Sequence, residues 1–128
     1  EELGSDEMGA IIIISPKYKN QGLVAARIEY TEFLNAGQAF RVGRYPIHFH
    51  LPGNMSTSYV RGNAIHHSNN RACTLHDVSN LLVEHNVVFS DTDQMIGAST
   101  DNTSNQSRII ILYQLTNLVD LIFDKVFA

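Results

Sequence analysis

Val60-Arg61-Gly62-Asn63-Ala64-Ile65 decides the fold, because its pattern recurs as Val83-Glu84-His85-Asn86-Val87-Val88 and occurs earlier as Ile28-Glu29-Tyr30-Thr31-Glu32-Phe33. Each copy has an apolar residue, two variable residues, a polar Thr or Asn, one more residue and a second apolar residue. Val60 and Val83 are 23 residues apart, a spacing that suits one coil of a solenoid of parallel strands. The sequence therefore predicts an all-β chain, a right-handed parallel β-helix fragment of about three coils.

The corners and loops of these coils can also be placed. Asn63 and Asn86 would occupy equivalent corners, where a side-chain amide can bond backbone groups that the bend leaves unpaired. Ile28 and Val60 are 32 residues apart, so the first coil needs a protruding loop, which we assign to residues 51–58. The run from 10 to 14 suits a strand buried on both faces. An α-helical period is not found in this region, whereas an antiparallel sandwich stays open as an alternative.

The chain divides into three predicted parts. Residues 1–99 form the β-helix coils, 100–107 a polar loop, and 108–128 a divergent apolar element that would cap an open end of the helix. The apolar residues of this last segment fall close to a 3.6 period, so a helix or a final strand pair would both serve. Its charged and polar residues make a membrane span an unsuitable interpretation.

Composition excludes several classes of function. The 128 residues are 44% hydrophobic and 17% charged, as expected for one ordered domain. A net charge of -4 with nine Lys and Arg argues against a nucleic-acid partner. The single cysteine, Cys73, cannot form an internal disulfide and is expected to be a buried thiol.

Targeting signals are sparse. The first residues lack the basic and apolar regions of a signal peptide. Three N-x-[ST] sequons favour a secretory route, with candidate glycosylation sites at Asn54, Asn102 and Asn105.

Histidines gather in the middle of the sequence. In the stretch 44–51, His48 and His50 alternate with apolar residues and should both point outward. Aligning this strand with residues 73–76 places His50 directly beside His76 in the next coil, at the strand spacing of about 4.8 Å. The pair His66-His67 follows a corner, and a turn role bonding to backbone is the simpler interpretation.

Three interpretations of this histidine group remain open. The first is a site for a divalent metal, with candidate ligands His48, His50, His76 and Asp77. The second is a cationic, hydrogen-bonding platform for an acidic sugar, with contact residues Arg44, His48, His50, Arg71 and His76. In the third, the imidazoles only pack and hydrogen-bond along the coil, and no cofactor or ligand is bound.

The stretches 43–51, 58–68, 70–72 and 81–86, above all the run Arg44-Tyr45-Pro46-Ile47-His48-Phe49-His50-Leu51, resemble a known family. The resemblance covers about 25–89 and is to the β-helix core shared by fibrocystin-L, fibrocystin, the transmembrane type of cell-surface hyaluronidase and the cell-migration-inducing hyaluronan-binding protein. It implies an extracellular location, in a secreted protein or a membrane-anchored ectodomain with a G8 domain ahead of the coils. It also implies hyaluronan binding or breakdown.

The sequence departs from that family after residue 89. The family usually continues with a G-H-x-F-F-x-E-D-G segment, whereas Ile96-Gly97-Ala98-Ser99-Thr100-Asp101 stands here. Glycan cleavage ordinarily needs a general acid and a base, and the acidic pair is missing. We therefore expect a binding or structural role toward an acidic polysaccharide such as hyaluronan. The alternatives are a hyaluronan-depolymerising glycosidase with His50 or His76 as catalytic base, or a purely architectural segment that contacts neighbouring coils.

Overall fold

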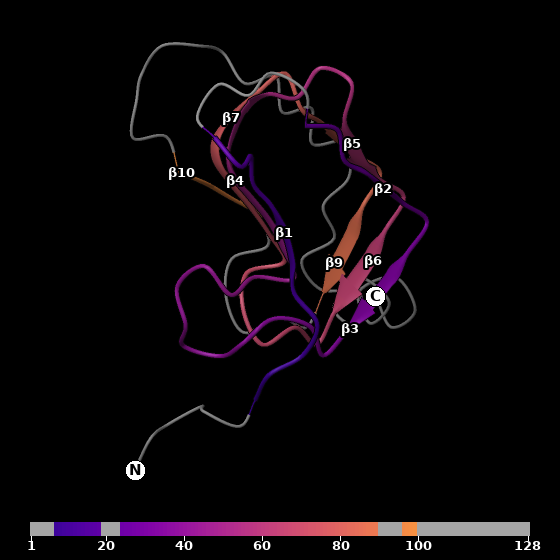
Figure 1. The fold of residues 1–128 in the computed structure, drawn as a ribbon. Coiled ribbons are helices and arrows are strands. Elements are labelled where there is room, and N and C mark those ends of the chain that lie inside the picture. The colour runs from indigo at the N-terminus through magenta and orange to yellow at the C-terminus, as the bar shows by residue number, and fades with distance from the viewer. Residues whose placement is uncertain (1–6, 19–23, 90–95, 100–128) are drawn as a thin grey trace.

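The computed structural model describes residues 7–18 and 24–89, and the backbone alone of 96–99 (Figure 1). This part of the chain contains short strands that return in turn to three parallel sheets, of order β1-β4-β7-β10, β2-β5-β8 and β3-β6-β9. The strands are β1 (Ile12–Ile14), β2 (Arg27–Glu29), β3 (Glu32–Leu34), β4 (Ile47–Asn54), β5 (Tyr59–Arg61), β6 (Ala64–His66), β7 (Cys73–Ser79), β8 (Leu82–Glu84), β9 (Val87–Phe89) and β10 (Ile96–Ser99). The predicted parallel β-helix is confirmed, and the antiparallel sandwich is not formed.

The sequence repeat coincides with the strand register. Ile28 pairs with Val60 and Val60 with Val83, while Phe33 pairs with Ile65 and Ile65 with Val88. The later members of these rows are almost fully buried, so the two apolar positions of the repeat line the interior of the coils. Burial of this kind, at about 25 cal/mol per Å² of apolar surface, is the main force that closes each coil onto the next.

The long first coil is explained differently from our expectation. Phe33 and Ile47 are 14 residues apart, whereas their partners Ile65 and Cys73 are 8 apart, so six of the nine extra residues lie between β3 and β4. Of the remaining three, one is at the register shift within β4, between His50 and Gly53, and two lie between β4 and β5. The assignment of the whole insertion to 51–58 is therefore wrong, because the first half of that segment continues β4 and Met55 is fully buried.

Each corner between the second and third sheets has the same backbone conformation. Tyr30, Gly62 and His85 occupy equivalent positions and have φ of 50°, 62° and 53°, the left-handed conformation that turns the chain sharply. The next residue in two of the coils is the buried Asn63 or Asn86. Such a repeated bend keeps the three faces of successive coils in line.

The two asparagines satisfy the backbone at these bends, as predicted. The Asn63 amide donates to the carbonyl of Ile28 at 3.1 Å, and its Oδ1 accepts from the N–H of Thr31 at 3.1 Å. The Asn86 amide donates to the carbonyl of Val60 at 2.9 Å. Asn86 Oδ1 accepts both the N–H and the side-chain amide of Asn63, at 3.0 and 2.9 Å, so the two corners are bonded to each other.

Two further predictions concern buried residues. Cys73 is 2% exposed, which confirms the expected buried thiol, and burial raises the pKa of this thiol to about 12. The expectation of two-sided burial near the N-terminus is wrong, because Ile14 is buried while Ile12 and Ile13 are 37% and 51% exposed. β1 is the edge of its sheet in the described structure, so no coil covers its outer side.

The predicted polar loop at 100–107 and capping element at 108–128 lie outside the described residues. Among the residues that are described, no helix is long and apolar enough to cross a membrane.

Candidate functional site

A row of aromatic rings runs across the outer face of β4 and β7, which lie side by side in Figure 1. The ring of Tyr45 is 5.1 Å from that of His48, His48 is 5.3 Å from His50, and His50 is 5.2 Å from His76, all edge to face. His50 and His76 are register partners, as the alignment of the two strands predicted. We call these four residues the histidine row.

His48 is on the outer side of the sheet, but it is not accessible as expected. Its side chain is covered by the loop between β3 and β4, and its Nδ1 hydrogen-bonds the carbonyl of Gly43 at 3.0 Å. Burial lowers the pKa of His48, the nearby His50 and His76 lower it further, and only the Gly43 carbonyl opposes the change. His48 is therefore a buried residue that favours its neutral form, and it supports the row from beneath the loop instead of offering a contact at the surface.

His50 and His76 are half-buried and stand where the sheet bends. The residues that follow them, Leu51 and Asp77, have φ of 56° and 51° at equivalent positions of the two coils. The register between β4 and β7 shifts just beyond this point. The bend opens a depression of about 230 Å³, lined by Ser15, Pro16, His50, Leu51, Pro52, Gly53 and Asp77.

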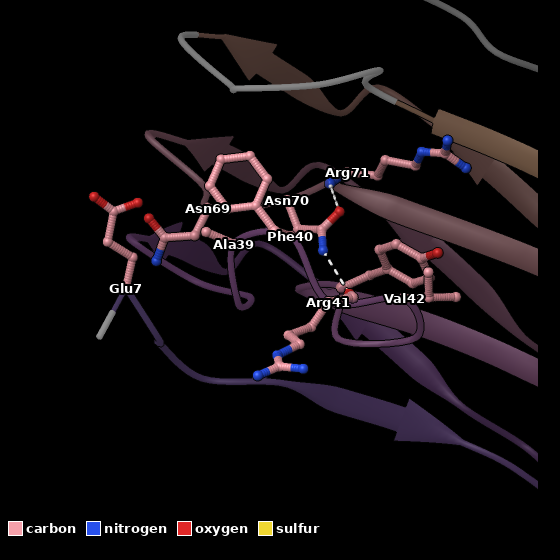
Figure 2. Close-up of a pocket in the computed structure, with 9 residues that line it drawn as sticks. Glu7, Ala39, Phe40, Arg41, Val42, Asn69, Asn70 and Arg71 are labelled. Atoms are coloured by element: carbon pink, nitrogen blue, oxygen red, sulfur yellow. Dashed lines mark hydrogen bonds between the residues drawn. The ribbon is translucent and has the colours of Figure 1, made fainter. Parts of the chain in front are cut away.

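A second depression, of about 290 Å³, lies at the other end of the same strands, before β4 and β7 begin (Figure 2). The side-chain amide of Asn70 holds the loop that lines this depression, because it donates to the carbonyls of Gln38 and Arg41 at 2.8 and 2.9 Å. Figure 2 shows the ring of Phe40 to the upper left of this amide, Arg71 extending to the upper right, and Arg41 below the amide with its guanidinium directed away from the ring. Phe40 is 81% exposed, a large apolar surface to leave in water on a loop.

Sequence reasoning missed this second depression. The signal that could have found it is the insertion between β3 and β4, because extra residues in one coil must protrude from the β-helix and form a surface loop. Of the predicted contact residues, Arg71 lines the second depression rather than joining His50, and Arg44 is exposed but lines neither depression.

The candidate metal ligands do not converge. Among the residues that the structure describes, no three His, Cys, Asp or Glu side chains gather in a geometry that could hold a metal ion. Asp77 shares a depression with His50 alone of the three candidate histidines, and His48 is turned toward Gly43. A mixed site made from all four candidates is therefore not present in this arrangement.

One candidate glycosylation site falls in the described chain. Asn54 is exposed at the end of β4, and its Oδ1 accepts from the N–H of Ser56 at 3.1 Å and from the Asn80 amide at 3.3 Å. Asn102 and Asn105 lie outside the described residues.

Comparison with known proteins agrees with this fold. A family model described as the CEMIP beta-helix matches residues 7–96. Human fibrocystin-L is 50% identical over 90 residues, which are 70% of this chain and 2% of fibrocystin-L. The human cell migration-inducing and hyaluronan-binding protein is 40% identical over 70 residues, which are 49% of this chain and 5% of that protein.

A third human relative, the cell surface hyaluronidase CEMIP2, is 32% identical over 91 residues, 66% of this chain and 6% of the hyaluronidase. The chain thus spans only a few per cent of the length of these relatives. No solved structure matches it. The family model covers strands β1 to β9, the corner asparagines and the histidine row, so the chain belongs to the CEMIP β-helix family.

Proposed function

We propose that this chain is an extracellular β-helix segment that binds an acidic polysaccharide of the hyaluronan type along the outer face of β4 and β7. The observation that carries the proposal is the placement of two depressions at the two ends of one row of rings. Arg71 and His76 are five residues apart on one extended segment, which spans about 16 Å. This length suits several sugar rings of an extended polymer better than one small ligand.

The two ends offer complementary contacts. At the second depression, the guanidinium of Arg41 can pair with a sugar carboxylate in bidentate fashion, and the exposed ring of Phe40 offers a flat apolar surface for a sugar ring. At the first, His50 lines the depression and His76 lies next to it in the histidine row, and both supply ring nitrogens for hydroxyl or carboxylate groups. The carboxylate of Asp77 disfavours a second acidic group there, so it would set the register of the polymer.

The names of two relatives support this chemistry. The cell migration-inducing and hyaluronan-binding protein and the cell surface hyaluronidase CEMIP2 are both named for hyaluronan, and the second also for the cell surface.

A second candidate function is depolymerisation of the same polymer. It is favoured by one observation, that His50 and Asp77 line a single depression, because a base and a carboxylate are the groups that glycan cleavage commonly uses. A third is a purely architectural role toward neighbouring coils, which the exposed Ile12 and Ile13 on the edge of β1 would serve.

Size-exclusion chromatography with light scattering, on the chain mixed with high-molecular-mass hyaluronan, separates these functions. We expect co-elution with intact polymer, lost in Arg41→Ala and in His50→Ala but kept in Arg27→Ala, which removes an exposed arginine from another face. If the unchanged chain shortens the polymer and the His50→Ala variant leaves it intact, the chain is instead an enzyme. A folded chain that neither binds nor shortens hyaluronan would refute the proposal and leave the architectural role.

A further inference from the structure

His66 and His67 form a close pair on the outer face of the third sheet, away from the histidine row. Their Nδ1 atoms are 2.9 Å apart and their rings are 5.2 Å apart. Adjacent residues of a regular strand point to opposite faces, so such a contact needs a break in the strand. The break is the left-handed conformation of His67, with φ of 52°, at the corner that follows β6.

Neighbouring side chains fix the ring of His66. Its Nε2 is 2.8 Å from a carboxylate oxygen of Glu32, and its ring stacks on that of Phe89 with 4.7 Å between centroids and an angle of 2°. A carboxylate only accepts hydrogen bonds, so the proton of a neutral His66 is on Nε2. Its Nδ1 then carries a lone pair directed at His67.

This arrangement is the one that metal-binding histidines use. A carboxylate that accepts a hydrogen bond from the far ring nitrogen fixes the tautomer and makes the near nitrogen a better ligand. Two nitrogens each about 2.0–2.1 Å from a metal are about 2.9 Å apart at a right angle and about 3.4 Å apart at a tetrahedral angle. The observed 2.9 Å is the length of an ordinary hydrogen bond between the two rings, and it equals the separation that the right angle of tetragonal Cu²⁺ or Ni²⁺ requires.

We propose that His66 and His67 form a two-imidazole site for a divalent transition-metal ion, Cu²⁺ or Ni²⁺, with Glu32 as a positioning residue. The ion binds beside the line that joins the two Nδ1 atoms, about 2.0–2.1 Å from each, and the proton that these atoms shared moves to Nε2 of His67. No three such ligands gather in the described part of the chain, so water fills the remaining coordination positions. The site is independent of polysaccharide binding.

Calorimetric titration of the full chain with Cu²⁺ near neutral pH, followed by electron paramagnetic resonance, tests the proposal. We expect one tight equivalent with nitrogen hyperfine structure from two imidazoles. His67→Asn should abolish it, because Asn tolerates the left-handed backbone but removes one ring nitrogen. Glu32→Gln should weaken the metal affinity about 10-fold or more without removing the site.

Controls distinguish this pair from the other histidines. The double variant His50→Ala, His76→Ala should keep the tight equivalent, as should His85→Ala, which removes an exposed histidine at another corner. Circular dichroism establishes that each variant is folded. Unchanged copper binding in folded His67→Asn, or loss of the tight equivalent in the His50, His76 double variant, would overturn the proposal.

Discussion

Replacing Asn63 by alanine tests the idea that the corner asparagines hold the coils together. Asn63 is 1% exposed, and its side chain donates to Ile28 and Asn86 and accepts from Thr31. Alanine leaves the Ile28 carbonyl and the Thr31 N–H without these partners. Asn86 Oδ1 still accepts the backbone N–H of residue 63.

The cost can be worked from these contacts. An unsatisfied buried polar group costs about 1–3 kcal/mol, and two backbone groups lose their partners. Because this corner is only partly buried on the side of the first coil, water can reach some of the freed groups, and we take the lower half of the range. Asn63→Ala should therefore lower the free energy of unfolding by about 2–4 kcal/mol.

Urea unfolding followed by circular dichroism measures this loss as a lower midpoint at unchanged slope. Thr31→Ala is the matched control, because Thr31 is the equivalent corner residue of the first coil and its exposed hydroxyl bonds only the carbonyl of Glu29. We expect the control to cost less than about 1 kcal/mol. A loss below about 1 kcal/mol for Asn63→Ala would refute the account of the corners.

Three other predictions follow from buried or exposed groups. With its pKa at about 12, Cys73 should stay unreactive toward a thiol reagent at pH 8 in the folded chain and react fully on unfolding. The lowered pKa of His48 means that the unfolded chain binds protons more readily, so stability should fall as the pH drops below about 6.5. Unfolding titrations of His48→Gln should show a shallower acid limb; an identical limb would contradict this. Secretion from a eukaryotic host should give a glycan-dependent mass shift at Asn54, which Ser56→Ala removes.

The parts of the fold that repeat were accessible from the sequence. The two apolar positions and the Thr or Asn of each copy fix the register of the second and third sheets, and a row such as Ile28, Val60 and Val83 follows from spacing alone. His50 and His76 were also predictable, because strands in register bring equivalent residues to the same height. Where the sequence repeats, equivalent residues of successive copies can be expected to lie next to each other in adjacent coils.

What does not repeat could not be predicted in this way. Alternation places His48 and His50 on one face, but it does not say whether a loop covers that face. Leu51 was expected to alternate inward with Phe49, yet its left-handed backbone breaks the strand pattern and leaves it 41% exposed. A non-glycine residue in this conformation carries no clear signal in a single sequence, because any strain is offset by packing elsewhere.

The insertion between β3 and β4 connects these exceptions to function. Six added residues give the first coil a loop that buries His48 through the carbonyl of Gly43 and, at the same time, exposes Phe40 and Arg41 beside Arg71. One change in coil length therefore removes a titratable group from the surface and adds a cation and an aromatic ring to it. Because the corner asparagines fix the coils of the β-helix beneath it, such a loop can vary without loss of the fold. Binding differences among β-helices of this family should accordingly follow the loop before β4 more closely than the strands.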